Sequence, residues 1–239
     1  MSVPRGKKVR GGASRASITF HESSDDIRSY FTLGQLLKGQ PASIKHLENV
    51  SRGVYVLISA LWESYCEDLA LEAAEVLVSS SVTPDDLPAA LARRIAIELR
   101  SDKHELSPWK LAGDGWRELA LSRVAHIARD TIFNSPKPAQ VDQLFDRAIG
   151  LSDISAQWPE SGEESEPDVR VALQNHIERR GEIAHGFRPR PTITKRRVSQ
   201  FFQLTRQLVY STDGLVGSFL EDKTGVHPWA VVGSTAVDP

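Results

Sequence analysis

The feature that most constrains the fold of this chain is an apolar periodicity that runs from about residue 43 to residue 78. Its apolar side chains recur at spacings of three and four residues: Leu47, Val50, Val54, Leu57, Ile58, Leu61, Tyr65, Leu69, Ala73, Val76 and Leu77. That spacing places them on one face of an α-helix, and Ser43 is a suitable N-cap because its hydroxyl can accept a hydrogen bond from an amide of the first turn. A helix this long must bury its apolar face against other helices, so the sequence predicts a helical bundle.

Weaker versions of the same pattern predict more helices between breaks rich in proline and glycine. They comprise a short helix at 25–37, a helix that begins near Pro84 and Pro88 and continues to Leu99, helix and loop at 108–127, a short helix at 141–149 stopped by Gly150, and helices at 169–184 and 198–220. The sequence has no alternating strand pattern of useful length and no repeat. The predicted fold class is therefore all-α, with long antiparallel helices and added short ones.

Charge and composition divide the chain into three parts. Residues 1–17 carry five basic residues and no acidic one, among glycine and serine, which predicts a flexible basic arm. Residues 18–220 hold the helical patterns and are predicted to form one domain, because a chain of 239 residues can bury a full core. Residues 221–239 are predicted to be a tail.

Composition excludes several classes of protein. Cys66 is the single cysteine, so the chain has neither an intramolecular disulfide nor a Cys-rich zinc site, and we expect a cytoplasmic location. No apolar run reaches the length of a signal-peptide core or a membrane span, so we expect neither export nor membrane insertion. His126 and Asp130 share a helix face, but two residues make a poor metal site, and we expect no metal or other cofactor.

The strongest candidate for chemistry is the stretch RRGEIAHG, residues 179–186. Its Arg-to-His spacing alone carries no weight, because 20 arginines and 7 histidines in this chain give about two such pairs by chance when four to six residues intervene. The position of Arg180 on the predicted helix is more informative. On an ideal helix, Arg180 lies within roughly 60° of the apolar residues Leu173, Ile177 and Ala184, and a guanidinium on such a face needs a carboxylate, an anion or a second chain as partner.

The helix geometry also separates the two candidate groups. His185 lies roughly 140° around the helix from Arg180, so the side chains can converge only if the helix ends near Gly186 or a second subunit supplies the complementary half. Glu63, in the long helix, is a candidate carboxylate that orients Arg180, and an exposed helix glutamate is the alternative interpretation.

The segment from residue 179 to 206 is strongly basic. Its basic residues are Arg179, Arg180, Arg188, Arg190, Lys195, Arg196, Arg197 and Arg206, opposed only by Glu182. Such a patch can attract a phosphate backbone without reading base sequence. The alternative is a solvated basic face that pairs with the acidic loop at 159–168.

These stretches together resemble a known family. RRGEIAHG resembles the closing Arg/His motif of HEPN-superfamily ribonucleases. SALWESYCEDLALEAAEVL, residues 59–77, is similar to the family's long helix with an early glutamate, and FNSPKPAQVDQLFDRAIGLSDISAQW, residues 133–158, is similar to a block of the RiboL-PSP branch. The resemblance spans about residues 43 to 215 and implies a HEPN-like helical bundle. One departure is Gly181, where the family usually has asparagine or another polar residue.

The resemblance implies a metal-independent endoribonuclease with Arg180 and His185 as catalytic residues and with Arg179, Glu63 and Glu182 in support. A histidine, whose ordinary pKa is about 6.5, can move a proton when a ribose 2′-hydroxyl attacks the adjacent phosphate, and an arginine can hold the charge that builds on that phosphate. The expected RNA-binding residues are Arg188, Arg190, Lys195, Arg196 and Arg197. The resemblance also implies a homodimer, and we expect a toxin or anti-phage effector with a possible antitoxin or defence-system partner.

Two other functions remain open at this stage. One is a HEPN-like module that binds RNA, a nucleotide or a partner protein without cutting, and Gly181 is the feature that favours it. The other is a plain helical scaffold. Cleavage of RNA by the intact chain, and its loss when Arg180 or His185 is replaced, separates the enzyme from both.

Overall fold

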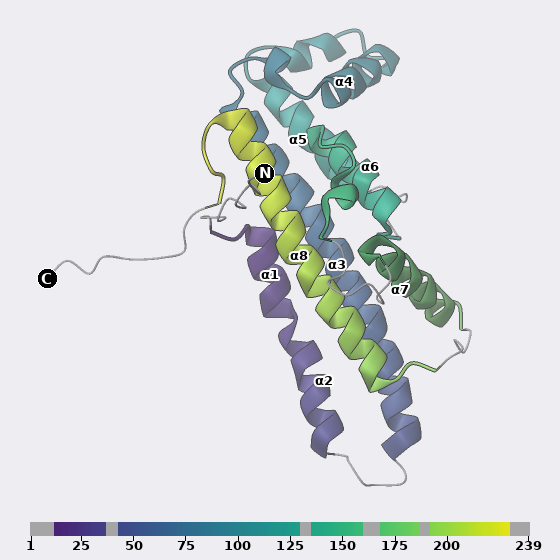
Figure 1. Ribbon diagram of the computed structural model, residues 1–239. Coiled ribbons are helices and arrows are strands. Elements are labelled where there is room, and N and C mark those ends of the chain that lie inside the picture. Colours follow the sequence, from purple (N-terminus) through teal and green to yellow (C-terminus); the bar gives the residue numbers. More distant parts are fainter. Residues whose placement is uncertain (1–11, 37–42, 130–134, 160–167, 187–191, 230–239) are drawn as a thin grey trace, which may run out of the picture.

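A computed structural model describes residues 12–36, 43–129, 135–159, 168–186 and 192–229 of the chain (Figure 1). All the regular elements in these residues are helices. They are α1 (Arg15–Ser23), α2 (Asp25–Leu36), α3 (Ser43–Ser80), α4 (Ala89–Ser101), α5 (Gly115–Ala128), α6 (Pro138–Ile149), α7 (Val169–Ala184) and α8 (Lys195–Thr224), with short 3-10 turns at Pro84–Asp86, Ser107–Leu111 and Ile154–Gln157. The predicted all-α fold class is confirmed.

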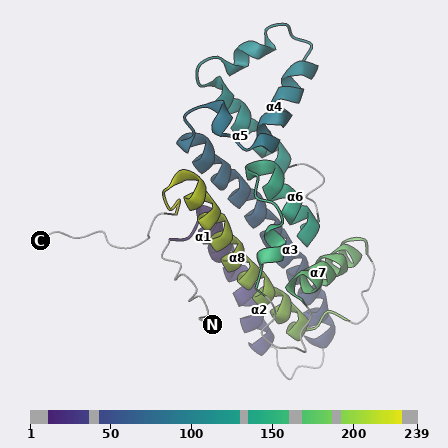
Figure 2. The same ribbon diagram turned by 45° about the horizontal axis from the view of Figure 1, so that its top comes forward.

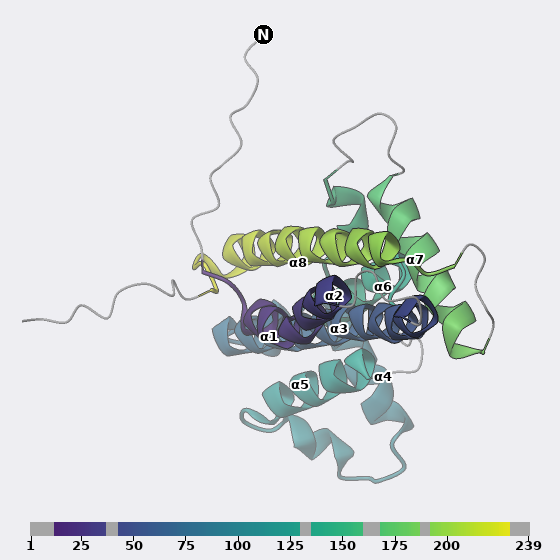
Figure 3. The ribbon, with the colours of Figure 1, turned by 90° about the horizontal axis from the view of Figure 1, so that it is seen from below.

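Helix α3 is the centre of the bundle. Its 38 residues span about 57 Å, and α1, α2, α5, α6, α7 and α8 all contact it. Figure 3 shows the arrangement from below, with α8 on one side of α3 and α5 on the other. The side chains of Ile58, Trp62, Cys66 and Leu69 are fully buried on α3, so the long apolar periodicity of the sequence forms the core, as predicted.

The helix directions are mixed. Helices α1 and α5 run antiparallel to α3, because Arg15 meets Glu72 near the end of α3 and Arg117, early in α5, donates to the Val78 carbonyl. The two longest helices are parallel instead, because the ring of Tyr55 lies 4.8 Å from that of Phe201 and the hydroxyl of Tyr65, further along α3, donates to the Val209 carbonyl. The expectation of long antiparallel helices is therefore wrong for α3 and α8. The chain crosses back through α4 to α7 before α8 begins (Figure 1).

The predicted N-terminal boundary is wrong, because residues 15–17 belong to helix α1 rather than to a basic arm. Ser14 caps α1, and its backbone amide and hydroxyl both bond to the carboxylate of Asp213 in α8. Arg15 pairs with Glu72 and Glu75 of α3. These partners lie at least 57 residues away in sequence, so local pattern alone could not reveal them. The other basic residues of the predicted arm lie outside the described residues.

The C-terminal boundary also differs from the prediction. Helix α8 continues past residue 220 to Thr224 and ends at Gly225, whose φ of +75° is left-handed. Beyond it, Trp229 is buried, and its indole Nε1 donates to the Asp213 carbonyl at 3.3 Å. A Cβ on Gly217 would lie 2.6 Å from that nitrogen. The predicted tail therefore begins with residues that pack on the domain.

Candidate active site

Helix α7 has the bounds predicted from sequence, Val169–Ala184, and its ends are set by local chemistry. Asp168 caps the start by accepting a hydrogen bond from the Arg170 amide at 2.6 Å. Gly186, with a φ of +78°, ends the helix in the left-handed region that favours glycine. Figure 2 shows α7 beside the lower halves of α3 and α8. The candidate motif thus occupies the last turns of a helix that packs on both of the long helices.

Arg180 lies at the edge of the apolar face of α7. Leu173 and Ile177 are buried, as predicted, whereas Ala184 is exposed, so the buried face ends close to Arg180. The guanidinium is half-buried, and its Nε is buried with no hydrogen-bond partner among the described residues. A buried donor without a partner costs about 1–3 kcal/mol. This position therefore has an unmet requirement for an acceptor or an anion.

Glu63 of α3 lies on the Arg180 side of α7. It is half-buried rather than fully exposed. Burial raises the pKa of the Glu63 carboxyl, and the Arg180 guanidinium opposes that rise. The charge of Arg180 therefore acts on Glu63, although the two groups are too far apart to form an ion pair. The placement shows a long-range electrostatic effect of Arg180 on Glu63, and no hydrogen bond or ion pair joins the two side chains among the described residues.

His185 follows the last residue of α7 as its C-cap and is exposed. Its backbone amide donates to the Gly181 carbonyl at 3.0 Å. The helix therefore ends at the point where an end or bend was needed for Arg180 and His185 to approach each other. Within the described residues of one chain, no hydrogen bond joins these two side chains.

Arg179 lies on a different side of α7 from Arg180. With Glu182 it lines a cavity of about 490 Å³ between α3, α7 and α8, on whose walls Tyr55 and His176 share a hydrogen bond. The His176 ring stacks on Phe201, with centroids 4.5 Å apart and planes 8° from parallel. Burial, reinforced by the charge of Arg179, lowers the pKa of His176 to about 4, so this histidine is neutral near pH 7.

The predicted RNA-binding residues have different environments. Arg188 and Arg190 lie outside the described residues, as does most of the acidic loop proposed as their partner. Lys195 donates from Nζ to the Phe31 carbonyl at 3.1 Å, so its charge is held against α2. Arg196 is exposed, and Arg197 is half-buried in the wall of the 490 Å³ cavity.

Sequence reasoning missed three residues near the motif. Tyr55 and His176 belong to segments 121 residues apart. Glu67 lies one turn after Glu63 on α3, and burial, with the charges of Glu63 and Asp68, raises its pKa to about 7. The i, i+4 spacing of Glu63 and Glu67 is visible in the sequence, and it was the only available signal for this cluster.

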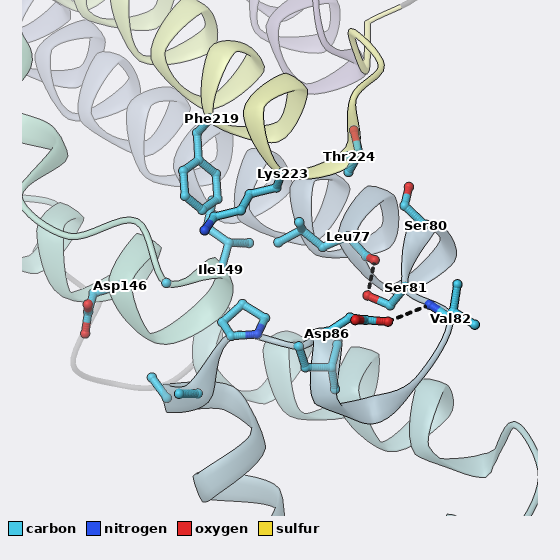
Figure 4. Close-up of a pocket in the computed structure, with 15 residues that line it drawn as sticks. Leu77, Ser80, Ser81, Val82, Asp86, Asp146, Ile149, Phe219, Lys223 and Thr224 are labelled. Atoms are coloured by element: carbon cyan, nitrogen blue, oxygen red, sulfur yellow. Dashed lines mark hydrogen bonds between the residues drawn. The ribbon is translucent and has the colours of Figure 1, made fainter.

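A larger cavity, of about 700 Å³, lies at the opposite end of α3 (Figure 4). Its single lysine, Lys223, lies over the ring of Phe219 at 5.7 Å from the centroid. Two carboxylates, Asp86 and Asp146, also line it, and Asp86 accepts from the Val82 amide at 2.9 Å. None of the predicted site residues lines this cavity, and its carboxylates outnumber its one cation, so it is a poor site for a phosphate.

The arrangement of the described residues bears on metal binding and on membrane insertion. No group of three or more histidine, cysteine, aspartate or glutamate side chains there is arranged to hold a metal ion. None of the helices there is both long enough and apolar enough to span a membrane.

The all-α bundle and the Arg/His motif at the end of α7 agree with a HEPN-like protein. The family model for RiboL-PSP-HEPN matches residues 21–218, and the chain belongs to this family. The match confirms the resemblance inferred from sequence and supports an RNA-related role of HEPN type. Comparisons with curated proteins and with solved structures return no match.

Proposed function

We propose that this protein is a metal-independent endoribonuclease whose catalytic residues are Arg180 and His185. The observation that carries the proposal is the position of Arg180, whose Nε is buried without a hydrogen-bond partner in the part of the chain that the structure describes, shortly before an exposed histidine at the helix end. A guanidinium with unmet donors is suited to hold a phosphate. An exposed histidine is accessible to a large substrate such as RNA.

The proposed reaction is an internal transfer at the phosphate. The ribose 2′-oxygen loses its proton to a base and attacks the adjacent phosphorus, and the 5′-oxygen of the next nucleotide leaves with a proton. His185 exchanges these protons, and Arg180 holds the non-bridging oxygens as their charge builds. Glu63 orients Arg180, and Arg179 with Glu182 positions the strand. The scheme needs no metal.

We further propose that the active form is a homodimer in which two copies of the motif face each other. A single chain contributes one exposed His185, and no hydrogen bond joins it to Arg180 in the described residues. A second copy can supply the complementary group, as the family resemblance implies. In this role the protein acts as a toxin or anti-phage effector, with an antitoxin or defence-system protein as a possible partner.

The direct test incubates the full chain with mixed RNA in EDTA and compares it with His185→Ala. The wild type is expected to cut and the variant to lose at least 100-fold in rate, because general acid–base catalysis contributes about 10²–10⁴-fold. His126→Ala is the matched control, since His126 is also exposed and lies near the end of a helix, in the last turn of α5. Equal cleavage by wild type and His185→Ala, or none by either, would contradict the catalytic proposal.

A second candidate function is a HEPN-like module that binds RNA, a nucleotide or a partner protein without cutting. Gly181 favours it, because the family usually has a polar residue there. A Cβ on Gly181 meets nothing within 4 Å, so Gly181→Asn is a suitable variant to restore a polar side chain. RNA binding without cleavage, both in the wild type and in Gly181→Asn, would favour the module.

A further inference from the structure

We propose that the cavity between α3, α7 and α8 binds one nucleotide of a single-stranded RNA, with Arg179 and Arg197 holding its phosphate. Arg180 and His185 do not line this cavity, so it is a subsite beside the cleavage motif rather than the motif itself. Its volume of about 490 Å³ falls within the range of about 300–1,000 Å³ that is typical of small-ligand pockets.

The two arginines are the first argument for a phosphate. Both are partly buried in the cavity wall, and neither guanidinium has an ion pair or hydrogen bond within the part of the chain that the structure describes. The nearby carboxylate of Glu178 is already engaged by Lys137 at 3.1 Å. Glu182, the other carboxylate of the lining, lies at the exposed rim. Two partly buried guanidinium groups without a bonded partner repel each other, and an anion between them removes that repulsion.

The start of α8 adds to the positive potential. Its first residues are Lys195, Arg196 and Arg197, and its first turn contains no acidic residue. The amino end of a helix carries partial positive charge, so cations there are unfavourable and acidic residues are the stabilising choice. A phosphate bound by Arg197 supplies the missing negative charge.

Tyr55 and His176 form an uncharged part of the cavity lining and hold each other in place. His176 is stacked on Phe201 and bonded to Tyr55. Its pKa of about 4 keeps the ring neutral, while burial raises the pKa of the Tyr55 phenol, which keeps its proton. Tyr55 can therefore donate to Nδ1, which leaves Nε2–H as a donor from the ring. A wall fixed in this way loses little freedom when a ligand binds.

The remaining lining groups suit a base better than a second phosphate. Gln200 carries both a hydrogen-bond donor and an acceptor, and Glu182, at the exposed rim, accepts only. Carboxylate and amide groups are the usual partners of the amino and ring-nitrogen groups on base edges. The cavity therefore has guanidinium groups that can hold a phosphate and amide and carboxylate groups that can bind a base, and the two together match a nucleotide.

The experiment measures binding, so it does not depend on cleavage. A fluorescein-labelled single-stranded RNA of seven nucleotides is titrated with the full chain in EDTA, in parallel for the wild type and the His185→Ala background. Arg197→Gln and Arg179→Gln are each expected to weaken binding 5- to 20-fold and to reduce the salt dependence by about one released ion. Thermal unfolding of each variant checks that the fold is kept.

The matched control is Arg196→Gln: the sequence predicts Arg196 as an RNA-binding residue just as it does Arg197, but Arg196 is exposed and does not line the cavity. It is expected to weaken binding no more than about 2-fold, and Arg93→Gln, on exposed α4 surface, not at all. Equal weakening by Arg196→Gln and Arg197→Gln would mean general surface attraction and would overturn the subsite. Free adenosine 5′-monophosphate is expected to compete only at millimolar concentration, and equal affinity for it would overturn the assignment to an RNA strand.

The assignment to RNA rests on the proposed function, and the two can fail separately. RNA binding that is weakened by Arg197→Gln, together with no RNA cleavage by the wild type, would contradict the ribonuclease proposal and support the subsite. Loss of cleavage in His185→Ala, together with an unchanged dissociation constant and KM in Arg197→Gln, would contradict the subsite proposal and support the ribonuclease.

Discussion

Helix α7 has two unlike sides, and each receives one arginine of the adjacent pair. On the α8 side, Arg179 lies with Arg197 beside the neutral groups of Tyr55 and His176. On the carboxylate side, which we define by Glu63 of α3 and by Glu67 one turn later, the charge of Arg180 acts on the Glu63 carboxyl. The difference indicates that sequence neighbours of the same charge can have different surroundings, because Arg179 lies beside neutral groups with Glu182 at the rim, whereas Arg180 lies near the Glu63 carboxyl.

The comparison also explains why the two sides respond oppositely to pH. Burial on the α8 side disfavours a cation, so the pKa of His176 falls to about 4. Burial and mutual repulsion on the carboxylate side disfavour anions, so the pKa of Glu67 rises to about 7, against the opposing effect of Arg129. Both shifts favour the neutral form of the group. A lower pH is therefore expected to destabilise the α8 side, and a higher pH the carboxylate side.

The largest expected effect separates the two arginines in catalysis. Arg180→Gln is expected to lower kcat by at least 100-fold, because removing a group that stabilises transition-state charge costs about 10²–10³-fold. Arg179→Gln is expected to act mainly on KM, about 5- to 20-fold, because it removes binding that is equal in the ground and transition states. Single-turnover and steady-state cleavage assays separate these constants. A loss of kcat in Arg179→Gln as large as in Arg180→Gln would remove the distinction between the sides.

The next effect is acid destabilisation of the α8 side. The pKa of His176 is about 4 in the folded chain against an ordinary 6.5, so the unfolded chain binds the extra proton and stability present above pH 6.5 falls as pH decreases toward 4. From pH 7 to pH 5 this group accounts for a loss of about 2 kcal/mol.

Urea unfolding of the wild type and His176→Gln at both pH values measures this loss. The variant, whose amide can still bond to Tyr55, is expected to lack it. His126→Gln, at an exposed position, is the control and is expected to keep the wild-type difference. An identical pH dependence in the wild type and His176→Gln would mean that the ring is not held neutral.

A smaller effect with the opposite sign is expected on the carboxylate side. The pKa of Glu67 is raised from 4.5 to about 7, so the stability present below pH 4.5 is lost as pH rises through 7. Glu67→Gln is expected to stabilise the chain at pH 8 by about 1 kcal/mol, a value reduced because the side chain is about half exposed to solvent, and to have little effect at pH 4.5. Chemical denaturation at the two pH values measures it, with the exposed Glu22→Gln as control. Stabilisation by Glu67→Gln of equal size at both pH values would exclude a titrating carboxyl as its cause.

The two sides also differ in how far the sequence predicts them. The bounds of α7 and the semi-buried position of Arg180 follow from local signals: Asp168, Gly186 and helical spacing. The α8 side depends on contacts between segments far apart in the chain. The sequence contains Arg170 and His176 at a spacing like that of the motif, yet Arg170 lies 3.8 Å from the Asp142 carboxylate while His176 bonds to Tyr55. Spacing cannot distinguish such a pair from a site, because the deciding partners come from other helices.

Helix α1 shows the same limit of local pattern. Its nine residues bury only Ala16, Ser17 and Phe20, which is too short and weak a periodicity to predict a helix. What stabilises it is the carboxylate of Asp213 at its cap and Glu72 at its first residues. These residues become neighbours only after α3 and α8 have packed, so the arm boundary at residue 17 could not have been corrected from sequence.

The smallest expected effect concerns Gly181, between the two sides. A glycine inside a helix costs about 0.5–1 kcal/mol relative to alanine, and a Cβ meets nothing within 4 Å at Gly181 or at Gly53 of α3. Gly53→Ala is therefore expected to stabilise the chain by that amount under all conditions. Gly181→Ala is expected to do the same only in the monomer, because the proposed homodimer brings a second copy against this end of α7. Urea unfolding and sedimentation velocity across a concentration series measure both. Equal stabilisation by the two variants at concentrations where the chain is dimeric would mean that the second copy does not contact this end of α7. Arg180 and His185 could then approach each other only through motion within one chain.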